Sequence, residues 1–439
     1  MKRINDFLME GDRVVRYLGD GRNLVFPEGV KWIGRSAFLR DITPVEFLPE
    51  GIELPEGLEG VDDHAFLGCD RLRKVVFPKG LRYIGVQAFS QCGFYGEILL
   101  PEGLEEIDDG AFNFNEYITA VKFPESLRKI GRTAFMSCRK IESVHIPASV
   151  CEIGSFAFAQ CSGIKQFTVS ENNLLFKGEG PFLLSKDGTR LLFAPGAEGR
   201  VVIPEGVTEI DRAAFIDNKK ITEIVFPDSL KEIKDKAFMD CNALTKLVFP
   251  KNLKSIGYQA FCSCEKLEHA EFPEGLEKLA ELAFIRCPLR DVKLPRSLRI
   301  LERFALDFSR INGFSVDLKN PYIREQDGFL LADGGSRLVT ADRAIKNAVI
   351  PKGVRVIDDD AFRDTGVESV VFPTTLEKIG YGAFGCGRLK KLCFLGTPKE
   401  ITESVFYYTP VKEVKRPKGN SAFWHKAFFN WRNIKWKTF

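Results

Sequence analysis

The chain has 439 residues, of which 44% are hydrophobic and 28% charged, a composition typical of a folded, water-soluble protein. Lys and Arg total 63 and Asp and Glu total 60, so the net charge of +3 gives no overall signature of a nucleic-acid or membrane-surface binder. At about 150 residues per domain, the length alone predicts roughly three globular domains. Phenylalanine is unusually frequent, with 38 residues, as many as glycine.

The N-terminal segment is polar, because Asn5, Asp6 and Glu10 follow its early basic residues, and this pattern does not predict a secretory signal peptide. No uncharged apolar run approaches 20 residues, so we expect no membrane span. The expected location is cytoplasmic, with a secreted or cell-surface location as the alternative if the sequence has been trimmed. The 11 cysteines are interpreted as reduced thiols, because a long chain builds a large core without disulfides.

Prolines recur at a regular spacing along most of the chain, with seven intervals of 23 residues and two of 22. These prolines are Pro27, Pro55, Pro78, Pro101, Pro124, Pro147, Pro204, Pro227, Pro250, Pro273, Pro295, Pro351 and Pro373. The tenth residue after each is Ala, and the eleventh is Phe in all units but one, which has Leu306. Such a period indicates a repeat protein.

Apolar residues also occupy fixed places around each proline. Aliphatic residues stand three and six places after it, as Leu81 and Ile84 do after Pro78, and apolar residues stand one and three places before it, as Phe77 and Val75 do. The spacing of two predicts a short strand that the proline ends, because proline has no N–H to donate. The Glu-Gly, Lys-Gly and Asp-Ser pairs that follow predict a turn.

The Ala-Phe stretch lacks β-branched runs and predicts a single helical turn on the opposite side of each coil. One repeat buries apolar residues on one side only, so neighbouring repeats must stack, and the sequence predicts a solenoid. With about 4.8 Å between paired strands, about fourteen coils would extend roughly 65–70 Å.

Residues 72–92 read Leu72-x-x-Val75-x-Phe77-Pro78-x-x-Leu81-x-x-Ile84-Gly85-x-x-Ala88-Phe89-x-x-Cys92, which resembles the Treponema pallidum-type leucine-rich repeat of BspA-like proteins. The resemblance covers almost the whole chain. It implies a right-handed leucine-rich repeat solenoid of the α/β horseshoe class, made mostly of short β-strands with short helical turns, with inserted β-hairpins and terminal caps. BspA-like relatives are associated with adhesion to host or matrix proteins and to other bacteria.

Two intervals between the prolines are long, 57 and 56 residues, and their extra segments resemble each other. Residues 182–188 match residues 329–335, and each segment combines two apolar runs around a turn, which predicts a β-hairpin. Residues 7–15 show a reduced version. The predicted organisation is an N-terminal hairpin cap (1–26), repeat blocks at 27–160, 201–308 and 349–415, inserted hairpins at 161–200 and 309–348, and a C-terminal aromatic cap (416–439).

The tail breaks the repeat, and residues 420–431 place Phe423, Ala427 and Trp431, or Trp424 and Phe428, on one helical stripe. We expect this aromatic helix to cover the last coil, because a solenoid needs a terminal cap. The same end is basic, which leaves weak binding to nucleic acid or an anionic surface open. Its basic residues are Lys415, Arg416, Lys418, Lys426, Arg432, Lys435 and Lys437.

A Cys or an Asn recurs fourteen places after the proline, which predicts a small donor bonded to a buried backbone carbonyl. These residues are Cys69, Cys92, Cys138, Cys161, Cys241, Cys264 and Cys287, with Asn115 and Asn218 in other units. A redox pair between adjacent coils is the alternative. Cys262-x-Cys264 lacks a second ligand pair at zinc-site spacing, so we predict no metal site.

The sequence offers little material for catalysis. The four histidines, His64, His145, His269 and His425, are scattered over different units, and phosphate-loop, zinc-protease and nucleophile-elbow motifs are absent. Acidic runs such as residues 358–360 recur just before Ala-Phe, and we interpret them as solvated turns in preference to cation sites. We therefore predict a non-enzymatic protein with no catalytic residue, cofactor or metal.

Function must then depend on positions that the repeat leaves free. Residues two and four places before the proline point away from the core, and adjacent coils align them into a surface that is apolar in one part and charged in another. An exposed apolar line with a charged margin is typical of a protein-binding surface, although Val also favours strands for their own sake. The partner-binding candidates are Lys74, Val76, Leu99, Lys122, His145, Val202, Val225, Lys246, Val248, His269, Glu271 and Lys293.

We interpret the chain as a monomeric leucine-rich repeat protein that binds a protein partner, with host or matrix proteins suggested by the resemblance. An intracellular scaffold is the first alternative. A nucleic-acid or anionic-surface binder that uses the basic tail is the second, and we expect no specific nucleic-acid partner.

Overall fold

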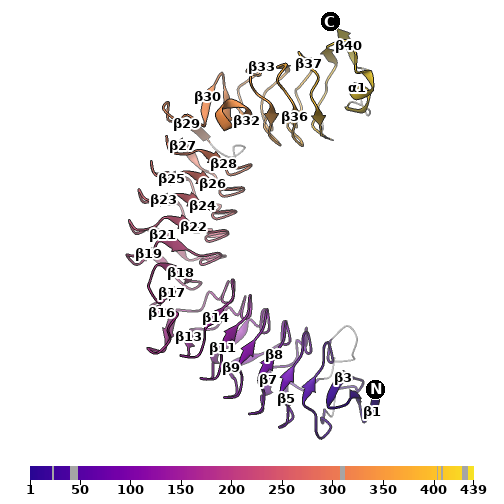
Figure 1. Cartoon of the computed structure of the whole chain (residues 1–439), viewed down its shortest axis with the longest axis vertical. Coiled ribbons are helices and arrows are strands. Elements are labelled where there is room, and N and C mark those ends of the chain that lie inside the picture. Colours follow the sequence, from indigo (N-terminus) through magenta and orange to yellow (C-terminus); the bar gives the residue numbers. More distant parts are fainter. Residues whose placement is uncertain (22–23, 40–47, 307–311, 403, 407–408, 428–433) are drawn as a thin grey trace. The chain divides into compact units, whose positions relative to one another are not determined.

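The computed structural model describes residues 1–439 except 22–23, 40–47, 307–311, 403, 407–408 and 428–433. Contacts divide the chain into two compact units. Unit 1 comprises Met1–Thr245 with Ala260–Lys266, and unit 2 comprises Lys246–Gln259 with Leu267–Phe439. Each unit is a stack of β-solenoid coils (Figure 1). The expectation of three globular domains from length is therefore wrong, whereas the repeat correctly predicts the solenoid.

Each regular coil contributes two short strands, so two parallel ladders run along each unit. The outer ladder contains the strands before the repeat prolines, together with the strands that pair with them in neighbouring coils. In unit 1 these are β5 (Gly51–Glu53), β7 (Lys74–Val76), β9 (Tyr95–Leu99), β11 (Tyr117–Lys122), β13 (Ser143–Ile146), β15 (Gln166–Val169), β19 (Gly199–Val202) and β21 (Ile221–Val225). In unit 2 they are β23 (Lys246–Val248), β25 (His269–Glu271), β27 (Arg290–Leu294), β29 (Asn312–Val316), β33 (Asn347–Val349), β35 (Ser369–Phe372), β37 (Lys391–Phe394), β39 (Glu413–Arg416) and β40 (Lys435–Thr438).

The second ladder, which the sequence did not predict, lies at the fifth and sixth residues after the proline. In unit 1 its strands are β4 (Trp32–Ile33), β6 (Gly60–Val61), β8 (Tyr83–Ile84), β10 (Glu106–Ile107), β12 (Lys129–Ile130), β14 (Glu152–Ile153), β20 (Glu209–Ile210) and β22 (Glu232–Ile233). In unit 2 they are β24 (Ser255–Ile256), β26 (Lys278–Leu279), β28 (Ile300–Leu301), β34 (Val356–Ile357), β36 (Lys378–Ile379) and β38 (Glu400–Ile401). Two residues are too few to show an alternating apolar pattern.

Antiparallel hairpins precede the second ladder at three places. They consist of β1 (Lys2–Ile4), β2 (Phe7–Glu10) and β3 (Arg13–Tyr17); of β16 (Phe176–Glu179), β17 (Phe182–Ser185) and β18 (Arg190–Phe193); and of β30 (Arg324–Gln326), β31 (Phe329–Ala332), the 3-10 turn η2 (Asp333–Gly335) and β32 (Arg337–Ala341). The last strand of each hairpin pairs in parallel with the next two-residue strand: β3 with β4, β18 with β20 and β32 with β34. Each hairpin thus provides the edge on which the following coils are built.

The Ala-Phe segment forms hydrogen-bonded turns, so the predicted helical turn is wrong. The residue before Ala has a positive φ in most coils, for example 57° at His64 and 50° at Gln87, which a right-handed helix excludes. The Phe N–H does not bond within its own coil. It donates to the Ala carbonyl of the next coil, as Phe66 does to Ala88 at 2.8 Å and Phe89 to Ala111 at 2.8 Å.

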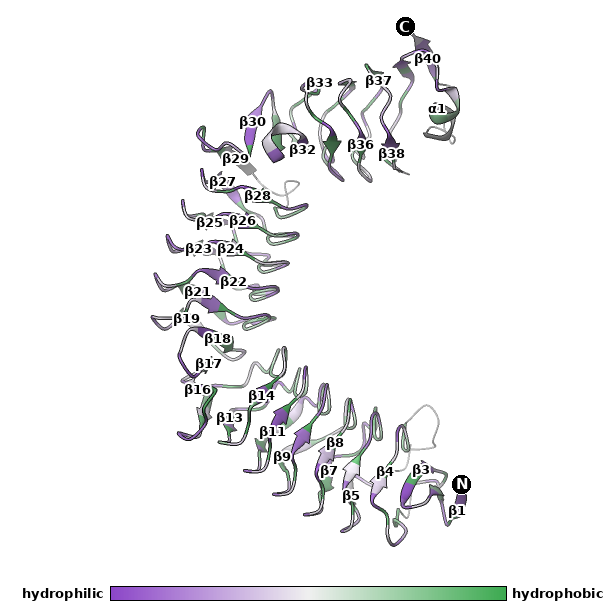
Figure 2. Ribbon diagram, in the orientation of Figure 1, coloured by the Kyte–Doolittle hydropathy of each residue, from purple (hydrophilic) through white to green (hydrophobic). Residues whose placement is uncertain are grey.

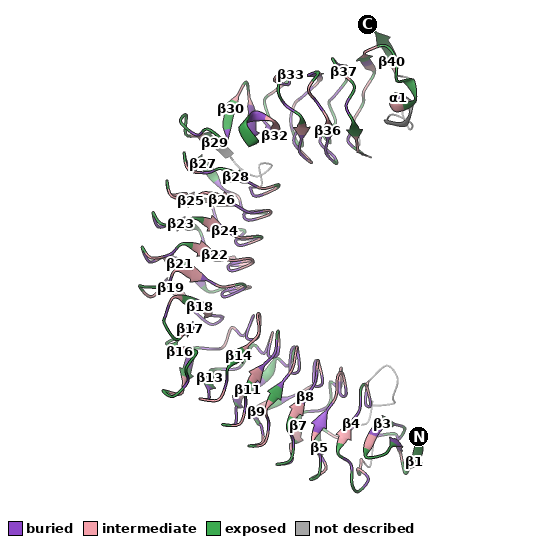
Figure 3. Cartoon of the chain, in the orientation of Figure 1, coloured by how far each residue is buried: buried purple, intermediate pink, exposed green. Residues whose placement is uncertain are grey.

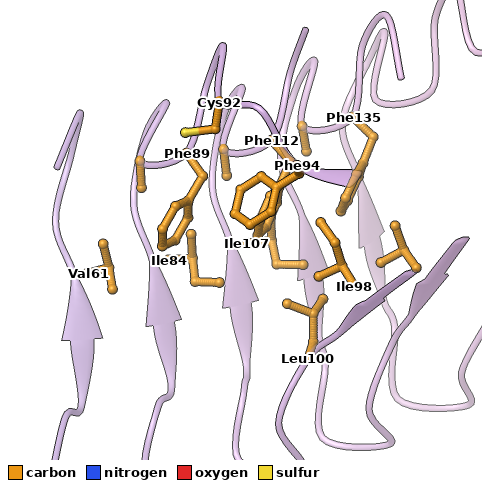
Figure 4. Close-up of a cluster of buried hydrophobic side chains, with 14 of the residues drawn as sticks. Val61, Ile84, Phe89, Cys92, Phe94, Ile98, Leu100, Ile107, Phe112 and Phe135 are labelled. Carbon is orange, nitrogen blue, oxygen red and sulfur yellow. The ribbon is translucent and has the colours of Figure 1, made fainter. Parts of the chain in front are cut away.

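Phenylalanine rings from neighbouring coils lie in a stack in the core of unit 1 (Figure 4). Phe89, Phe112 and Phe135 are fully buried, and their ring centroids lie 5.5 and 5.3 Å apart with nearly parallel planes. Phenylalanines before the proline meet this stack edge-on, as Phe123 does with Phe135 at 5.5 Å. Hydrophobic and hydrophilic stretches follow one another along the coils of both units (Figure 2).

At the C-terminal end, helix α1 (Ser421–Ala427) precedes β40. Trp424 is fully buried, and its ring centroid lies 4.9 Å from that of Phe394 on β37. The guanidinium of Arg416 lies 5.8 Å from the centre of the Trp424 ring. Trp424, an aromatic residue of the expected C-terminal cap, therefore contacts the core. Phe428 and Trp431, which the sequence also assigned to the cap, lie outside the described residues.

Replacing Phe112 by Ala should lower the free energy of unfolding by about 3–5 kcal/mol, because the change removes a fully buried ring between two stacked neighbours. Urea unfolding monitored by circular dichroism measures this loss. Tyr95→Ala is the matched control at an exposed aromatic residue and should change stability by about 0.5 kcal/mol or less. Equal losses in the two variants would contradict the assignment of Phe112 to the central stack.

Candidate interaction surface

The outer ladder carries all of the partner-binding candidates on its outward side. Eleven of the twelve side chains are exposed and Val225 is half-buried. Residues between them point inward, as Ile98 does beside Leu99 and Val292 beside Lys293. The outward side of these strands is called the outer face below. Placement of the candidates on this face follows from the strand alternation that the sequence indicated.

The strand register brings some candidates together. In unit 1, Leu99 pairs with Lys122 and Val202 with Val225. In unit 2, Lys246 pairs with His269 and Val248 with Glu271, and the Lys246 ammonium lies 2.9 Å from the Glu271 carboxylate. Val248 thus has an acidic neighbour within its unit.

Large exposed apolar side chains lie on three consecutive outer strands in unit 1. Tyr95 on β9 and Tyr117 on β11 are direct partners in the parallel register, with 67% and 50% of their surfaces exposed. Leu99 is 61% exposed, and Val76 on the next strand, β7, is 46% exposed. The Tyr95 N–H donates to the Arg73 carbonyl at 3.1 Å and joins β9 to that coil. We call Val76, Tyr95, Leu99 and Tyr117 the Tyr95 patch.

Sequence reasoning missed both tyrosines of this patch. Tyr95 lies six residues before Pro101 and Tyr117 seven residues before Pro124, whereas the predicted outward positions are two and four residues before the proline. A register irregularity between Ile118 and Ala120 compensates for the unequal spacing and places the two residues opposite each other. The recurrence of a tyrosine near the same place in two consecutive repeats was the one feature of the sequence that could have indicated this patch.

A lysine from the following coil contacts the patch. The Lys140 ammonium lies 4.6 Å from the centre of the Tyr117 ring, which is a cation–π contact. Lys122 lies beside Leu99, and Glu97 stands between Tyr95 and Leu99 on β9. The patch is therefore apolar in its middle and charged at its margin.

The acidic pairs before Ala-Phe tie adjacent coils together. The second Asp of a pair accepts a backbone N–H from the next coil: Asp63 from Val86 at 3.0 Å and Asp359 from Tyr381 at 2.8 Å. The first Asp meets a basic side chain, as Asp108 meets Lys129 at 3.1 Å. Burial raises the pKa of Asp108, but hydrogen bonds from Lys129, from the Asp109 backbone and from Tyr83 outweigh it, so its pKa is lowered overall.

These contacts give the carboxylates a structural role in place of the solvated-turn role expected from sequence. Within the described part of the chain, no group of three or more His, Cys, Asp or Glu residues has a metal-binding arrangement.

The recurring cysteines are donors to backbone carbonyls. The Cys92 Sγ lies 3.2 Å from the Phe66 oxygen and the Cys161 Sγ 3.0 Å from the Phe135 oxygen, each reaching the preceding coil. Asn115 takes the same place and donates to the Phe89 carbonyl at 2.8 Å. Burial raises the pKa of the Cys161 thiol to about 12, which keeps it protonated and unreactive.

A cavity of about 330 Å³ in unit 2 is lined by Arg and Asp side chains around the third hairpin. Arg303 binds Asp359 at 2.7 Å and Arg363 binds Asp360 at 3.3 Å. Asp358 is only 8% exposed and lies 2.6 Å from Arg337. Asp358, Asp359 and Asp360, the carboxylates named in the cavity lining, are therefore each engaged by an arginine.

Comparison with known proteins identifies the repeat. The family described as the BspA type leucine rich repeat region, in six copies, matches residues 18–117, 48–165, 198–312 and 341–438. No curated protein matches the chain significantly.

Within the described residues, no helix combines the length and apolar character needed to cross a membrane.

Several solved structures resemble the chain. A leucine-rich repeat protein from Eubacterium ventriosum is 19% identical, with 84% of this chain and 86% of that chain covered and a TM-score of 0.51. A leucine rich cell surface protein from Faecalibacterium prausnitzii is 21% identical over 90% and 95%, with a TM-score of 0.47. The pneumococcal vaccine antigen PcpA is 16% identical over 100% and 98%, with a TM-score of 0.49. At 19% identity, the resemblance to the Eubacterium ventriosum protein shows a similar fold and nothing more.

The buried Asp358 should make stability depend on pH. Burial raises the pKa of Asp358 to about 6, against the opposing effect of Arg337, whereas an unfolded Asp titrates near about 3.9. Between these values the folded state holds the proton that the unfolded state releases, so stability falls as pH rises from about 4 to 6. The loss should be about 2 kcal/mol, and Asp358→Asn should remove it.

Urea unfolding at pH 4, 5, 6 and 7 measures this difference between wild type and Asp358→Asn. Asp364→Asn, at an exposed neighbouring carboxylate, should leave the wild-type pH dependence intact. Parallel pH profiles for wild type and Asp358→Asn would show that Asp358 does not titrate in this window.

Proposed function

Because the chain belongs to the BspA-type leucine-rich repeat family, whose fold generally serves protein interaction, we propose that it binds another protein through the Tyr95 patch. The observation that supports this most directly is the pairing of two half-exposed tyrosines beside a largely exposed leucine. Clustered exposed apolar side chains of this kind mark interaction sites on soluble proteins.

The composition of the patch favours a protein partner. Tyrosine is enriched among the residues that dominate binding energy in protein interfaces, because it buries a large ring and keeps a polar hydroxyl. Leu99 and Val76 add aliphatic surface, while Lys122 and Glu97 supply the polar rim that such interfaces have. The pairing of β9 with β11 holds Tyr95, Leu99 and Tyr117 in fixed register, which lowers the entropy lost on binding.

The role is binding and not catalysis. The carboxylates and thiols described above hold coils together, and the family is generally non-enzymatic. For the biological setting, we propose adhesion to host or matrix proteins, by analogy with BspA-like relatives, with an intracellular scaffold as the alternative. Both settings would use the same surface, and they differ in where the partner is found.

Affinity capture with the immobilised protein tests the proposal. Matrix-protein extract and cell lysate are applied separately to wild type, to a Tyr95→Asp/Leu99→Asp variant and to a Leu174→Asp control, which places a charge on an exposed apolar residue of unit 1 that is not a partner-binding candidate. We expect a captured protein whose recovery falls at least tenfold with the patch variant and not with the control, since a desolvated carboxylate in an apolar contact is costly.

The source of the captured protein separates the two settings. Recovery from matrix extract supports adhesion, and recovery from lysate alone supports the scaffold. Capture that is equal for wild type and the patch variant would show that the Tyr95 patch is not the binding surface. Circular dichroism of each variant establishes that the coils remain folded.

A further inference from the structure

A second surface lies on the outer face of unit 2, on the five-stranded sheet β33-β35-β37-β39-β40. The parallel register aligns one outward residue from each strand in a row. The row runs Val349, Val371, Cys393, Lys415 and Lys437. Its character therefore changes from apolar on β33 and β35 to basic on β39 and β40.

A second outward row lies beside the first. It runs Asn347, Ser369, Lys391, Glu413 and Lys435. Val349 is 64% exposed, and β40 is exposed along its length (Figure 3). We call the two rows together the β33–β40 face. Its apolar part and its basic part are neighbours on one continuous sheet.

The positive charge of this face is largely uncompensated. Its four lysines meet one acidic residue, Glu413, which pairs with Lys437 at 2.8 Å. Lys391 and Lys435 make no ion pair with any described residue, and the Lys415 ammonium lies 5.3 Å from the centre of the Phe439 ring. Residues 410–439 hold eight Lys or Arg and one Glu, a surplus of seven in a chain whose total charge is +3.

We propose that the β33–β40 face binds an extended acidic segment of another protein, with large apolar side chains at one end and carboxylates at the other. The apolar end lies over Val349 and Val371, and the carboxylates meet Lys391, Lys415 and Lys435. Five strands about 4.8 Å apart span roughly 19 Å, which an extended segment of about six residues covers at about 3.3 Å per residue.

The apolar half of the face distinguishes this partner from nucleic acid. A phosphate backbone would use only the lysines, and its binding would depend on charge alone. Val349 and Val371 gain from contact with apolar side chains, which a phosphate chain does not supply. The site is independent of the Tyr95 patch, because it lies on other strands in the other unit.

Fluorescence anisotropy with a labelled probe tests the proposal. The probe is a nine-residue peptide with Leu-Phe-Val at one end, a Ser-Gly spacer and Glu-Asp-Glu-Asp at the other. We expect binding to the full chain that weakens at least tenfold in Lys415→Gln/Lys435→Gln and at least fivefold in Val371→Asp. Lys378→Gln/Lys399→Gln removes the same charge from ion-paired positions in the same unit and should leave binding unchanged.

Further probes distinguish an acidic protein segment from a simple polyanion as the ligand of this face. A peptide with Ser in place of Leu-Phe-Val should bind at least fivefold more weakly than the parent, and a twenty-nucleotide oligo-dT should bind more weakly than the parent at 150 mM salt. Equal binding of the Ser peptide, or tighter binding of oligo-dT, would overturn the proposal in favour of a charge-only site. Equal weakening in both lysine variants would also overturn it.

The Tyr95→Asp/Leu99→Asp variant separates this inference from the proposed function. It should bind the acidic peptide as wild type does while losing its captured partner. Loss of peptide binding in that variant would contradict a separate site in unit 2.

Discussion

The bond from the Phe N–H of one coil to the Ala carbonyl of the next is the contact on which the rest of the structure depends. It recurs at 2.7–2.9 Å through consecutive coils, as from Phe112 to Ala134 and from Phe135 to Ala157. Each bond fixes the neighbouring coil at strand spacing, and that spacing lets the phenylalanine rings stack at about 5 Å. Hydrogen bonding and ring packing thus impose the same repeat distance, and a coil satisfies both only when its neighbours are present.

The stacking of coils also explains the recurring Asp, Cys and Asn side chains, which look like candidates for catalytic or metal-binding groups in the sequence. A buried coil turn leaves backbone N–H and carbonyl groups that need partners, because burying them unpaired is costly. The Asp pairs accept N–H groups from the next coil, and the Cys and Asn side chains donate to carbonyls of the preceding coil. These Asp, Cys and Asn side chains therefore join neighbouring coils. The outward side chains of the outer ladder do not fill the core of the coils. We therefore assign the proposed binding function to these positions.

Those outward positions form two surfaces of different chemistry. The Tyr95 patch in unit 1 is aromatic and aliphatic with charges at its margin, and the β33–β40 face in unit 2 grades from valine to lysine. Both depend on parallel pairing, which places residues about one repeat apart in the sequence side by side. A ladder of this kind displays a row of independent side chains on a rigid support, which suits recognition of an extended or irregular protein surface.

The sequence by itself determined the solenoid, its period, the strands before the prolines and the inward places of Phe, Ile and Leu, because these depend on a pattern repeated in every coil. It also placed the candidate residues on the outer face, since strand alternation is local. Only the tertiary structure decided the second ladder, the turn at Ala-Phe and the pairing of Tyr95 with Tyr117. Two-residue strands carry no periodic signal, the turn is set by a bond to the next coil, and the tyrosines meet through a register irregularity at Ile118. In each case the deciding contact joins residues in different coils, and a single repeat does not contain that information.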